Sequence, residues 1–247
     1  MKLLLIGAGN MGGAILSNLK DLNIDVFEKN KKRVEELKKK YPEVRFLDEM
    51  PNISNYIVIL AIKPQSLNSL ELQGEAEGVI SILAGVSIDR LKSKIKAKGY
   101  VRAMPNVAAQ IGKSITLLTG DIALREMAET ILLSIGDVIW LDSEEEIDIA
   151  TAIASSAPAW IAIVAEALSD GAVKMGLARN LSYKIVAKMI EGSGALLNNI
   201  HPALLKDMVT SPKGTTISGV SILEKGGVRD SFISAVEAAF KRAQELK

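Results

Sequence analysis

The sequence predicts an α/β protein in which a doubly wound sheet is followed by an all-helical half. Short apolar runs alternate with helical segments from residue 2 to about residue 142, which is typical of parallel strands covered by helices. Beyond that point the segments are helical and rich in alanine. With 247 residues and 48% hydrophobic composition, the chain is long enough to bury a sizeable core and to form two domains.

The first strand, predicted at residues 2–6, leads into the motif Gly-Ala-Gly-Asn-Met-Gly at 7–12. Strand, Gly-x-Gly-x-x-Gly and helix form the context that a dinucleotide fingerprint requires. Gly7 permits the tight turn, Gly9 lets a pyrophosphate approach the backbone, and Gly12 lets the helix pack closely on the strand. N–H groups at the start of the helix then face the phosphates. We interpret the motif as a nucleotide site; the alternative is a glycine-rich turn without a ligand.

Two signals after the second strand, predicted at 24–27, disagree about the cofactor. Glu28 lies where an acidic side chain accepts hydrogen bonds from the adenosine ribose hydroxyls in NAD-binding folds. Lys29 begins a basic cluster that continues to Arg33, and such cations suit a 2′-phosphate. The carboxylate favours NADH and the cluster permits NADPH, so both cofactors stay open. Alternatively, these residues only cap the charged helix predicted at 31–40.

The remaining strands are predicted from further apolar runs. The run at 56–61 is continuous, as expected for a central parallel strand that is buried on both faces. It ends in a polar turn stiffened by Pro64, at the edge of the sheet where such folds bind ligands. Further strands are predicted at 44–47, 79–83, 100–104, 115–119 and 138–141, with helices at about 87–96 and 121–135.

The second half of the chain is predicted to be helical throughout. Ser143 and Glu146 have the spacing of a capping box, so a helix begins there. We interpret the uncharged stretch 149–165 as two buried helices interrupted near Pro158, because its hydroxyls and proline disfavour a membrane span. Helices follow at 158–176, 180–199, 201–209, 215–225 and 228–246, and the expected domains are residues 1–148 and 149–247.

Composition excludes several kinds of chemistry. The chain has no cysteine and a single histidine, His201, so disulfides, thiolate nucleophiles and a metal site built from Cys or several His are excluded. The net charge of +1 provides no global field that would attract nucleic acid or an anionic membrane. The first residues enter a strand directly, so we expect no signal peptide and a cytoplasmic location.

One loop of the helical half has the chemistry of an anion site. Residues 209–216 read Val-Thr-Ser-Pro-Lys-Gly-Thr-Thr and directly precede a helix. N–H groups at the start of that helix can hold a carboxylate, and the hydroxyls can donate or accept hydrogen bonds. Routine N-capping by serine and threonine explains the same residues equally well.

The chain resembles the Δ1-pyrroline-5-carboxylate reductases from residue 1 to about residue 245. Several separated motifs in the right order carry this resemblance, and together they are far more specific than the glycine loop alone. They lie at 7–12, at 61–65 (Ala-Ile-Lys-Pro-Gln), 84–86 (Ala-Gly-Val), 102–106 (Arg-Ala-Met-Pro-Asn), 158–159 (Pro-Ala), 166–173 (Glu-Ala-Leu-Ser-Asp-Gly-Ala-Val), 209–216 and 223–229 (Leu-Glu-Lys-Gly-Gly-Val-Arg).

The resemblance implies an N-terminal doubly wound Rossmann domain followed by an all-α C-terminal dimerisation domain. It implies NADPH or NADH as cofactor and reduction of a cyclic imine, Δ1-pyrroline-5-carboxylate, to L-proline in the last step of proline biosynthesis. It also implies a homodimer with interlocked C-terminal helices, which in the family can build larger assemblies of dimers. Because the cofactor brings the hydride, this chemistry needs neither histidine nor cysteine.

The resemblance also assigns residues to the site. Thr216 matches the hydroxyl that hydrogen-bonds the substrate nitrogen, and it is the expected catalytic residue. The expected substrate-binding residues are Ser211, Gly214, Thr215 and Thr216. The expected cofactor-binding residues are Gly7, Gly9, Asn10, Met11, Gly12, Glu28, Lys29, Asn30, Ala61, Lys63, Pro64, Ala84, Gly85, Met104 and Asn106.

Three departures from the family pattern fall in or near the expected substrate cleft. The usual Gly-Ser-Gly-Pro-Ala reads Ser-Ser-Ala-Pro-Ala at 155–159, Ser-Pro-Gly-Gly reads Ser-Pro-Lys-Gly at 211–214, and Asn-Thr-Pro reads Asn-Val-Ala at 106–108. The alternatives are therefore a reductase of another cyclic imine, an enzyme like the β-hydroxyacid dehydrogenases with Lys174 or Lys188 as the lysine, or an NAD(P)-binding protein without turnover.

Overall fold

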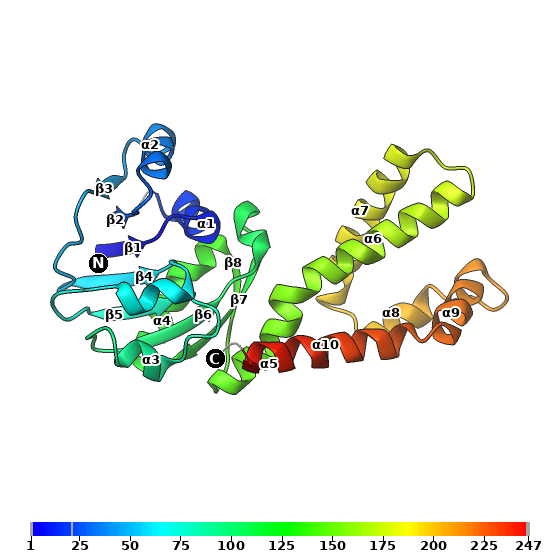
Figure 1. Cartoon of the computed structure of the whole chain (residues 1–247). Coiled ribbons are helices and arrows are strands. Elements are labelled where there is room, and N and C mark those ends of the chain that lie inside the picture. Colours follow the sequence, from blue (N-terminus) through cyan, green and yellow to red (C-terminus); the bar gives the residue numbers. More distant parts are fainter. Residues whose placement is uncertain (1, 21, 246–247) are drawn as a thin grey trace. The chain divides into compact units, whose positions relative to one another are not determined.

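The computed structural model describes residues 2–20 and 22–245, and these form two compact units (Figure 1). One unit holds the described residues up to Ser155 together with those from Ala239 onward, and the other holds Ser156–Ala238. The expected domain boundary between residues 148 and 149 stays a prediction.

The first unit is built on a single sheet of eight strands among the described residues. Its order is β3-β2-β1-β4-β5-β6-β7-β8. All eight strands lie where the apolar runs of the sequence predict them. Their bounds are β1 Lys2–Ile6, β2 Ile24–Phe27, β3 Arg45–Leu47, β4 Tyr56–Leu60, β5 Gly78–Ser81, β6 Tyr100–Met104, β7 Ser114–Gly120 and β8 Gly136–Trp140.

Helices cover both faces of this sheet, as the doubly wound pattern predicts (Figure 1). Leu3 and Leu5 of β1 point to the face covered by α1 (Asn10–Leu19), α2 (Lys31–Lys40) and α4 (Arg125–Leu132). Leu4 and Ile6 point to the other face, which is covered by η1 (Pro64–Ser69) and α3 (Ile88–Lys92). Because strand side chains alternate between the two faces, one apolar strand contributes to both halves of the core.

The last two strands depart from the expected parallel arrangement. β7 runs antiparallel to β6, with Ala103 opposite Leu118, and β8 runs parallel to β7. Residues 105–113 connect β6 to β7 and contain only the short η2 (Val107–Ile111). A parallel crossover needs a dozen or more residues, so this connection is too short and the chain turns back. η3 (Ile122–Leu124) and η4 (Leu133–Ile135) flank α4 before β8.

One continuous helical stretch replaces the expected pair of helices interrupted at Pro158. It consists of α5 (Glu144–Thr151), a π turn (Ala152–Ser156) and α6 (Ala157–Lys174). Pro158 lacks an N–H group and is the second residue of α6, in the first turn after the π turn, where its missing donor costs no regular helical hydrogen bond. By length and composition alone this stretch is apolar enough to cross a membrane, and 17% of its most apolar window is buried within the chain.

The start of α5 confirms the predicted capping box. The Ser143 hydroxyl accepts a hydrogen bond from the Glu146 N–H at 3.1 Å. The Glu146 carboxylate in turn accepts from the Asp142 N–H at 2.9 Å. The two side chains therefore satisfy backbone donors at the helix start, as the motif requires.

The second unit consists of helices whose positions the sequence predicts closely. α6 packs beside α7 (Arg179–Leu197), and the Ser182 hydroxyl donates to the Ser169 carbonyl at 3.1 Å across this pair. The remaining helices are α8 (Pro202–Met208), α9 (Thr215–Lys225) and α10 (Val228–Glu245). His201 caps α8, since its Nδ1 accepts from the Ala203 N–H at 3.3 Å. Among the described residues of this unit, the buried ones are Ser169, Ser182 and Val186.

Candidate functional site

The glycine motif adopts the geometry of a phosphate-binding loop. Gly7 has a φ of +93°, and a Cβ there would lie 2.7 Å from the Ala61 carbonyl oxygen. A Cβ on Gly12 would lie 2.2 Å from the Gly7 carbonyl oxygen, so α1 packs this closely only with glycine. The Cβ side of Gly9 faces open space, and no side chain caps α1. The first N–H groups of α1 are therefore available to an anion.

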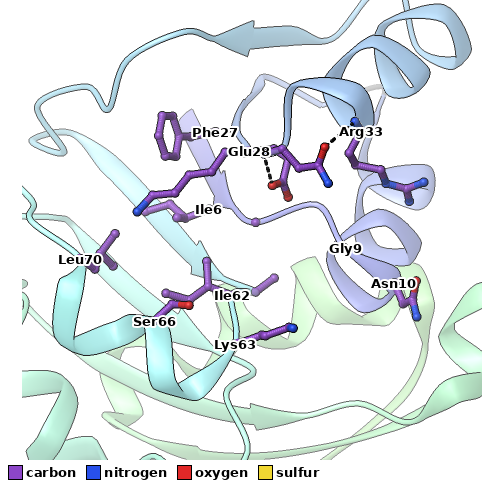
Figure 2. A pocket seen from close by; sticks show the side chains of 14 residues that line it. Ile6, Gly9, Asn10, Phe27, Glu28, Arg33, Ile62, Lys63, Ser66 and Leu70 are labelled. Carbon is purple, nitrogen blue, oxygen red and sulfur yellow. Dashed lines mark hydrogen bonds between the residues drawn. The ribbon is translucent and has the colours of Figure 1, made fainter.

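A cavity of about 430 Å³ lies at the carboxyl ends of β1, β2 and β4 (Figure 2). This edge of the sheet is where doubly wound folds bind ligands. Eight of the expected cofactor-binding residues line it: Gly7, Gly9, Asn10, Glu28, Lys29, Asn30, Ala61 and Lys63. The other lining residues are Ile6, Phe27, Arg33, Ile62, Ser66 and Leu70.

Glu28 joins the glycine loop to the turn that begins α2. Its Oε2 accepts a hydrogen bond from the Ala8 N–H at 2.7 Å, and its Oε1 accepts from the Asn30 N–H at 2.8 Å. Figure 2 shows the carboxylate directed toward the loop that carries Gly9. Hydrogen bonds to an ionised acceptor are among the stronger ones in proteins, so this carboxylate is held in place.

Arg33 is a lining residue that lies outside the expected site residues. Its Nε donates to the Ala8 carbonyl at 3.0 Å, and a Cβ on Gly13 would lie 2.8 Å from its guanidinium. The Asn30 side chain accepts from the Arg33 N–H at 3.2 Å, so Asn30 does cap α2. The basic cluster pointed to this region. Of the cations in that cluster, Lys29 and Arg33 line the cavity.

A second cavity of about 310 Å³ lies between the start of α1 and the segment after β6. Asn10 lines both cavities, and Met11 and Asn106 bring two more expected residues to the second. The Asn106 amide is already engaged, because Nδ2 donates to the Ala154 carbonyl at 3.0 Å and Oδ1 accepts from the Ala108 N–H at 3.1 Å. The full lining is Asn10, Met11, Pro105, Asn106, Val107, Gln110 and Ser155.

The remaining expected cofactor residues line neither cavity. Met104 is 7% exposed and packs against Leu117 and Ile147. Gly85 has a φ of +70° in the turn after β5. Gly12 keeps α1 close to the loop, Pro64 begins η1, and Ala84 is exposed in the turn.

The expected substrate loop lies in the second unit, before α9. Gly214 is the first residue outside this helix, and no side chain caps its N–H groups. Ser211 accepts a hydrogen bond from the Gly214 N–H through its carbonyl at 3.1 Å, not through its hydroxyl. The capping interpretation is therefore not realised in this loop. The N–H groups of Thr215 and Thr216, at the start of α9, remain available to a carboxylate.

The lysines considered for a dehydrogenase-like reaction lie in the same unit. Lys188 is largely exposed and its ammonium pairs with the Glu191 carboxylate at 2.6 Å. A hydrogen bond to Glu191 raises the pKa of Lys188 above its usual value. A raised pKa keeps the amine protonated, which is the opposite of what a general base requires.

The fold and the two cavities define a dinucleotide-binding domain, which is followed by a helical domain. Residues 2–85 match the family described as "NADP oxidoreductase coenzyme F420-dependent", and residues 144–246 match "Pyrroline-5-carboxylate reductase dimerisation". The chain is 38% identical to a pyrroline-5-carboxylate reductase of Thermus thermophilus, over 100% of this chain and 98% of that protein. The chain belongs to the pyrroline-5-carboxylate reductase family.

Solved structures of similar proteins agree with this assignment. A pyrroline-5-carboxylate reductase from Coxiella burnetii superimposes with a TM-score of 0.87 at 28% identity, over 100% of this chain and 98% of that one. A pyrroline carboxylate reductase from Plasmodium falciparum, solved with NADP bound, superimposes with a TM-score of 0.79 at 26% identity, over 100% and 98%. The family and the fold expected from the separated sequence motifs are thereby confirmed.

Proposed function

We propose that this chain reduces Δ1-pyrroline-5-carboxylate to L-proline with a hydride from NADPH or NADH. The observation that carries the proposal is full-length identity with reductases of this name, 38% in the Thermus thermophilus protein. The glycine loop and its two cavities support it, because they provide a cofactor site at the expected edge of the sheet. Residues 1–148 form the dinucleotide-binding domain and residues 149–247 the dimerisation and substrate domain.

The cofactor supplies the hydride, and the protein supplies placement and electrostatics. Gly9 and the uncapped start of α1 hold the pyrophosphate, since neither a Cβ nor a capping side chain blocks the approach. The larger cavity, with Glu28 and Arg33, takes the adenosine end. Lys63, at the carboxyl end of β4, lines the same cavity and leads toward the nicotinamide side.

Residues before α9 position the substrate. Ser211, Gly214 and Thr215 hold its carboxylate, with support from the uncapped N–H groups of the helix start. The Thr216 hydroxyl hydrogen-bonds the imine nitrogen. A protonated imine accepts a hydride readily, so a hydroxyl that orients the nitrogen suffices and no histidine or cysteine is needed.

The test is loss of nicotinamide absorbance with Δ1-pyrroline-5-carboxylate, with proline measured as the product. Thr216→Ala should lower turnover about tenfold or more, because a hydrogen bond to a charged group contributes about 1.5–3 kcal/mol. Thr216→Ser keeps the hydroxyl and should retain most of the activity. Full turnover by Thr216→Ala at saturating substrate would contradict its role. A folded chain that binds cofactor but reduces no pyrroline-5-carboxylate would overturn the function itself.

The preferred cofactor is NADPH. Glu28, the residue that would select NADH, is already engaged by two backbone N–H groups, while the cations Lys29 and Arg33 line the adenosine cavity. The NADP bound in the Plasmodium falciparum structure supports the same choice. Arg33→Ser should lower kcat/KM for NADPH at least about tenfold and that for NADH much less.

The matched control for this preference is Lys32→Ser. Lys32 belongs to the same basic cluster and is exposed, and it lines neither cavity. A comparable loss of NADPH selectivity in Lys32→Ser and Arg33→Ser would indicate a general charge effect. Equal kcat/KM for the two cofactors in the unaltered chain would contradict the preference for NADPH.

The active form is a homodimer with interlocked C-terminal helices, and its location is the cytoplasm. The dimerisation family matched over residues 144–246 supports the homodimer. The absence of cysteine from the sequence is consistent with a reducing compartment. Sedimentation velocity measures the assembly, and localisation of a tagged chain measures the compartment.

A further inference from the structure

Ser155 is a buried hydroxyl whose position in the fold is unusual. It lies in the π turn Ala152–Ser156, where the helix leaves its regular hydrogen bonding. Its Oγ is inaccessible to solvent and has no hydrogen-bond partner among the described residues. In a regular helix a serine can donate to the carbonyl four residues earlier, but the π turn displaces that carbonyl. A buried hydroxyl without a partner costs free energy, so one is expected to have a use.

The surroundings of Ser155 supply that use. It lines the 310 Å³ cavity together with the start of α1 and the segment 105–107 after β6. The Asn106 amide fixes this arrangement, because its Nδ2 donates to the carbonyl of Ala154, the residue before Ser155. Both polar atoms of the Asn106 side chain, Nδ2 and Oδ1, already make hydrogen bonds within the chain. Asn106 therefore positions the π turn, and Ser155 is the residue that can contact a ligand.

The position of Asn10 indicates which part of a dinucleotide would occupy the 310 Å³ cavity. It lines both this cavity and the larger one, which holds Glu28 and Arg33. If the pyrophosphate lies at the start of α1 and the adenosine in the larger cavity, the nicotinamide end falls on the side of Met11 and Ser155. A carboxamide offers both a donor and an acceptor, and a hydroxyl can pair with either.

We propose that the Ser155 hydroxyl, turned about χ1 into the cavity that this residue lines, binds the carboxamide of the nicotinamide ring. The inference rests on the proposed function, because it takes the cofactor to be a nicotinamide dinucleotide. Ser155 stands where the family's Gly-Ser-Gly-Pro-Ala pattern begins with glycine. The chain thus replaces a bare backbone position with a cofactor-contacting hydroxyl in the cavity beside the glycine loop.

The experiment is isothermal titration calorimetry of the full-length chain, which measures the affinity for two ligands, NADPH and 2′-phospho-ADP-ribose. The second ligand lacks the nicotinamide. Ser155→Ala should weaken NADPH binding about three- to tenfold, the loss expected for one neutral hydrogen bond. It should leave the affinity for 2′-phospho-ADP-ribose within twofold. For a chain that prefers NADH, the corresponding pair is NADH and ADP-ribose.

Two variants separate the hydroxyl from other effects. Ser155→Gly restores the residue of the family pattern and should show the same selective loss as Ser155→Ala. Ser169→Ala is the matched control, because Ser169 Oγ is also buried without a partner among the described residues but lines neither cavity. Ser169→Ala should bind both ligands as the unaltered chain does.

Two outcomes would overturn the inference. One is unchanged NADPH affinity in both Ser155 variants, and the other is an equal loss of affinity for both ligands. Either is distinguishable from failure of the proposed function, because no imine substrate is present in the titration. A chain that binds no dinucleotide at all would contradict the proposed function and with it the inference.

Discussion

Lys213 holds a backbone conformation that suits glycine. Its φ is +59°, in the left-handed region where a Cβ is unfavourable. Lys213→Gly should therefore raise the free energy of unfolding by about 0.5–1 kcal/mol, even though glycine gains entropy in the unfolded chain. Urea unfolding at a fixed protein concentration measures the change.

The control for Lys213 is Asn55, whose φ of +69° is in the same region. Asparagine tolerates this conformation better than lysine does, so Asn55→Gly should gain less. A loss of stability in Lys213→Gly would show that the lysine side chain makes a contact worth more than the strain it causes.

Lys2 stabilises the folded chain through contacts that are lost when its ammonium group deprotonates at alkaline pH. Its ammonium lies 3.0 Å from the Asp25 carboxylate and 4.5 Å from the centre of the Tyr56 ring. A hydrogen bond to Tyr56, and next to it one to Asp25, raise the pKa of Lys2. A pKa that is higher in the folded chain gives stability that is full below the usual lysine pKa and lost as the pH rises through the raised value.

Lys2→Met tests this dependence. At neutral pH the variant should be less stable than the unaltered chain, and the gap should close as the pH rises through the raised pKa of Lys2. The measurement is the free energy of urea unfolding of both chains as a function of pH. The Arg45 guanidinium, 3.9 Å from the Asp25 carboxylate, is present in both chains, whereas the contacts of Lys2 with Tyr56 and Asp25 are both lost in Lys2→Met. A gap that stays constant across alkaline pH would refute the assignment.

For single residues, the sequence predicts the position of a side chain in the fold better than it predicts the hydrogen bonds that the side chain makes. It places Glu28 at the end of a strand, and the structure confirms that position. It does not predict that two backbone N–H groups occupy the carboxylate, because the Ala8 donor is 20 residues away and depends on the shape of the loop. The unpartnered hydroxyl of Ser155 depends likewise on a π turn, and no residue pattern in the stretch marks that turn.

The contact between β6 and α5 depends on a buried ion pair. Arg102 is 1% exposed, and its guanidinium lies 2.6 Å from the Asp148 carboxylate and 3.2 Å from that of Glu144. The same Glu144 oxygen accepts from the Ile88 N–H at 3.1 Å. One arginine therefore connects the middle of the sheet, the start of α5 and the start of α3.

Arg102→Met should lower the free energy of unfolding by about 3–5 kcal/mol, the usual cost of removing one partner of a buried pair. Arg125→Met is the control, because Arg125 pairs with Glu129 at the surface at 2.8 Å and should cost about 1 kcal/mol or less. Chemical denaturation of both variants gives the comparison. Similar losses would mean that burial does not govern the Arg102 pair.

The elements themselves were largely predictable, and the exceptions have physical causes. Strand positions follow from apolar runs, and helix starts follow from caps such as Ser143, because both signals are local. The direction of β7 depends on whether the segment 105–113 is long enough for a parallel crossover. That question concerns chain length and geometry, and the residue types in the segment do not answer it. The π turn could not be predicted either, because Pro158 indicates that the helix is interrupted but not that the interruption is a π turn.

The helical unit leaves a large apolar surface uncovered within one chain. Ile163 is 63% exposed and Ile222 is 69% exposed, while few of the described side chains of this unit are buried. The dimerisation family matched over residues 144–246 explains the pattern, because a second copy can cover these faces.

Ile163→Glu should shift the assembly to monomers, because burying an unpaired carboxylate costs several kcal/mol. Ile122→Glu is the control, since Ile122 is 68% exposed but belongs to the sheet unit. Sedimentation velocity over a range of concentrations distinguishes the two variants. An unchanged dimer in Ile163→Glu would place the interface elsewhere on the chain.

The reversed direction of β7 has a practical consequence for engineering. Gly120 ends β7 opposite Val101, and the Asp121 N–H donates to the Tyr100 carbonyl, so the segment 121–124 lies at the edge where β6 begins. The glycine loop lies at the other edge. Because the Asp121 carboxylate accepts from the Tyr100 N–H at 2.7 Å and Leu124 packs on the sheet core, an insertion at 121–124 would disturb the start of β6. The exposed Ala123 side chain is instead the place to attach a fluorescent reporter away from the glycine loop.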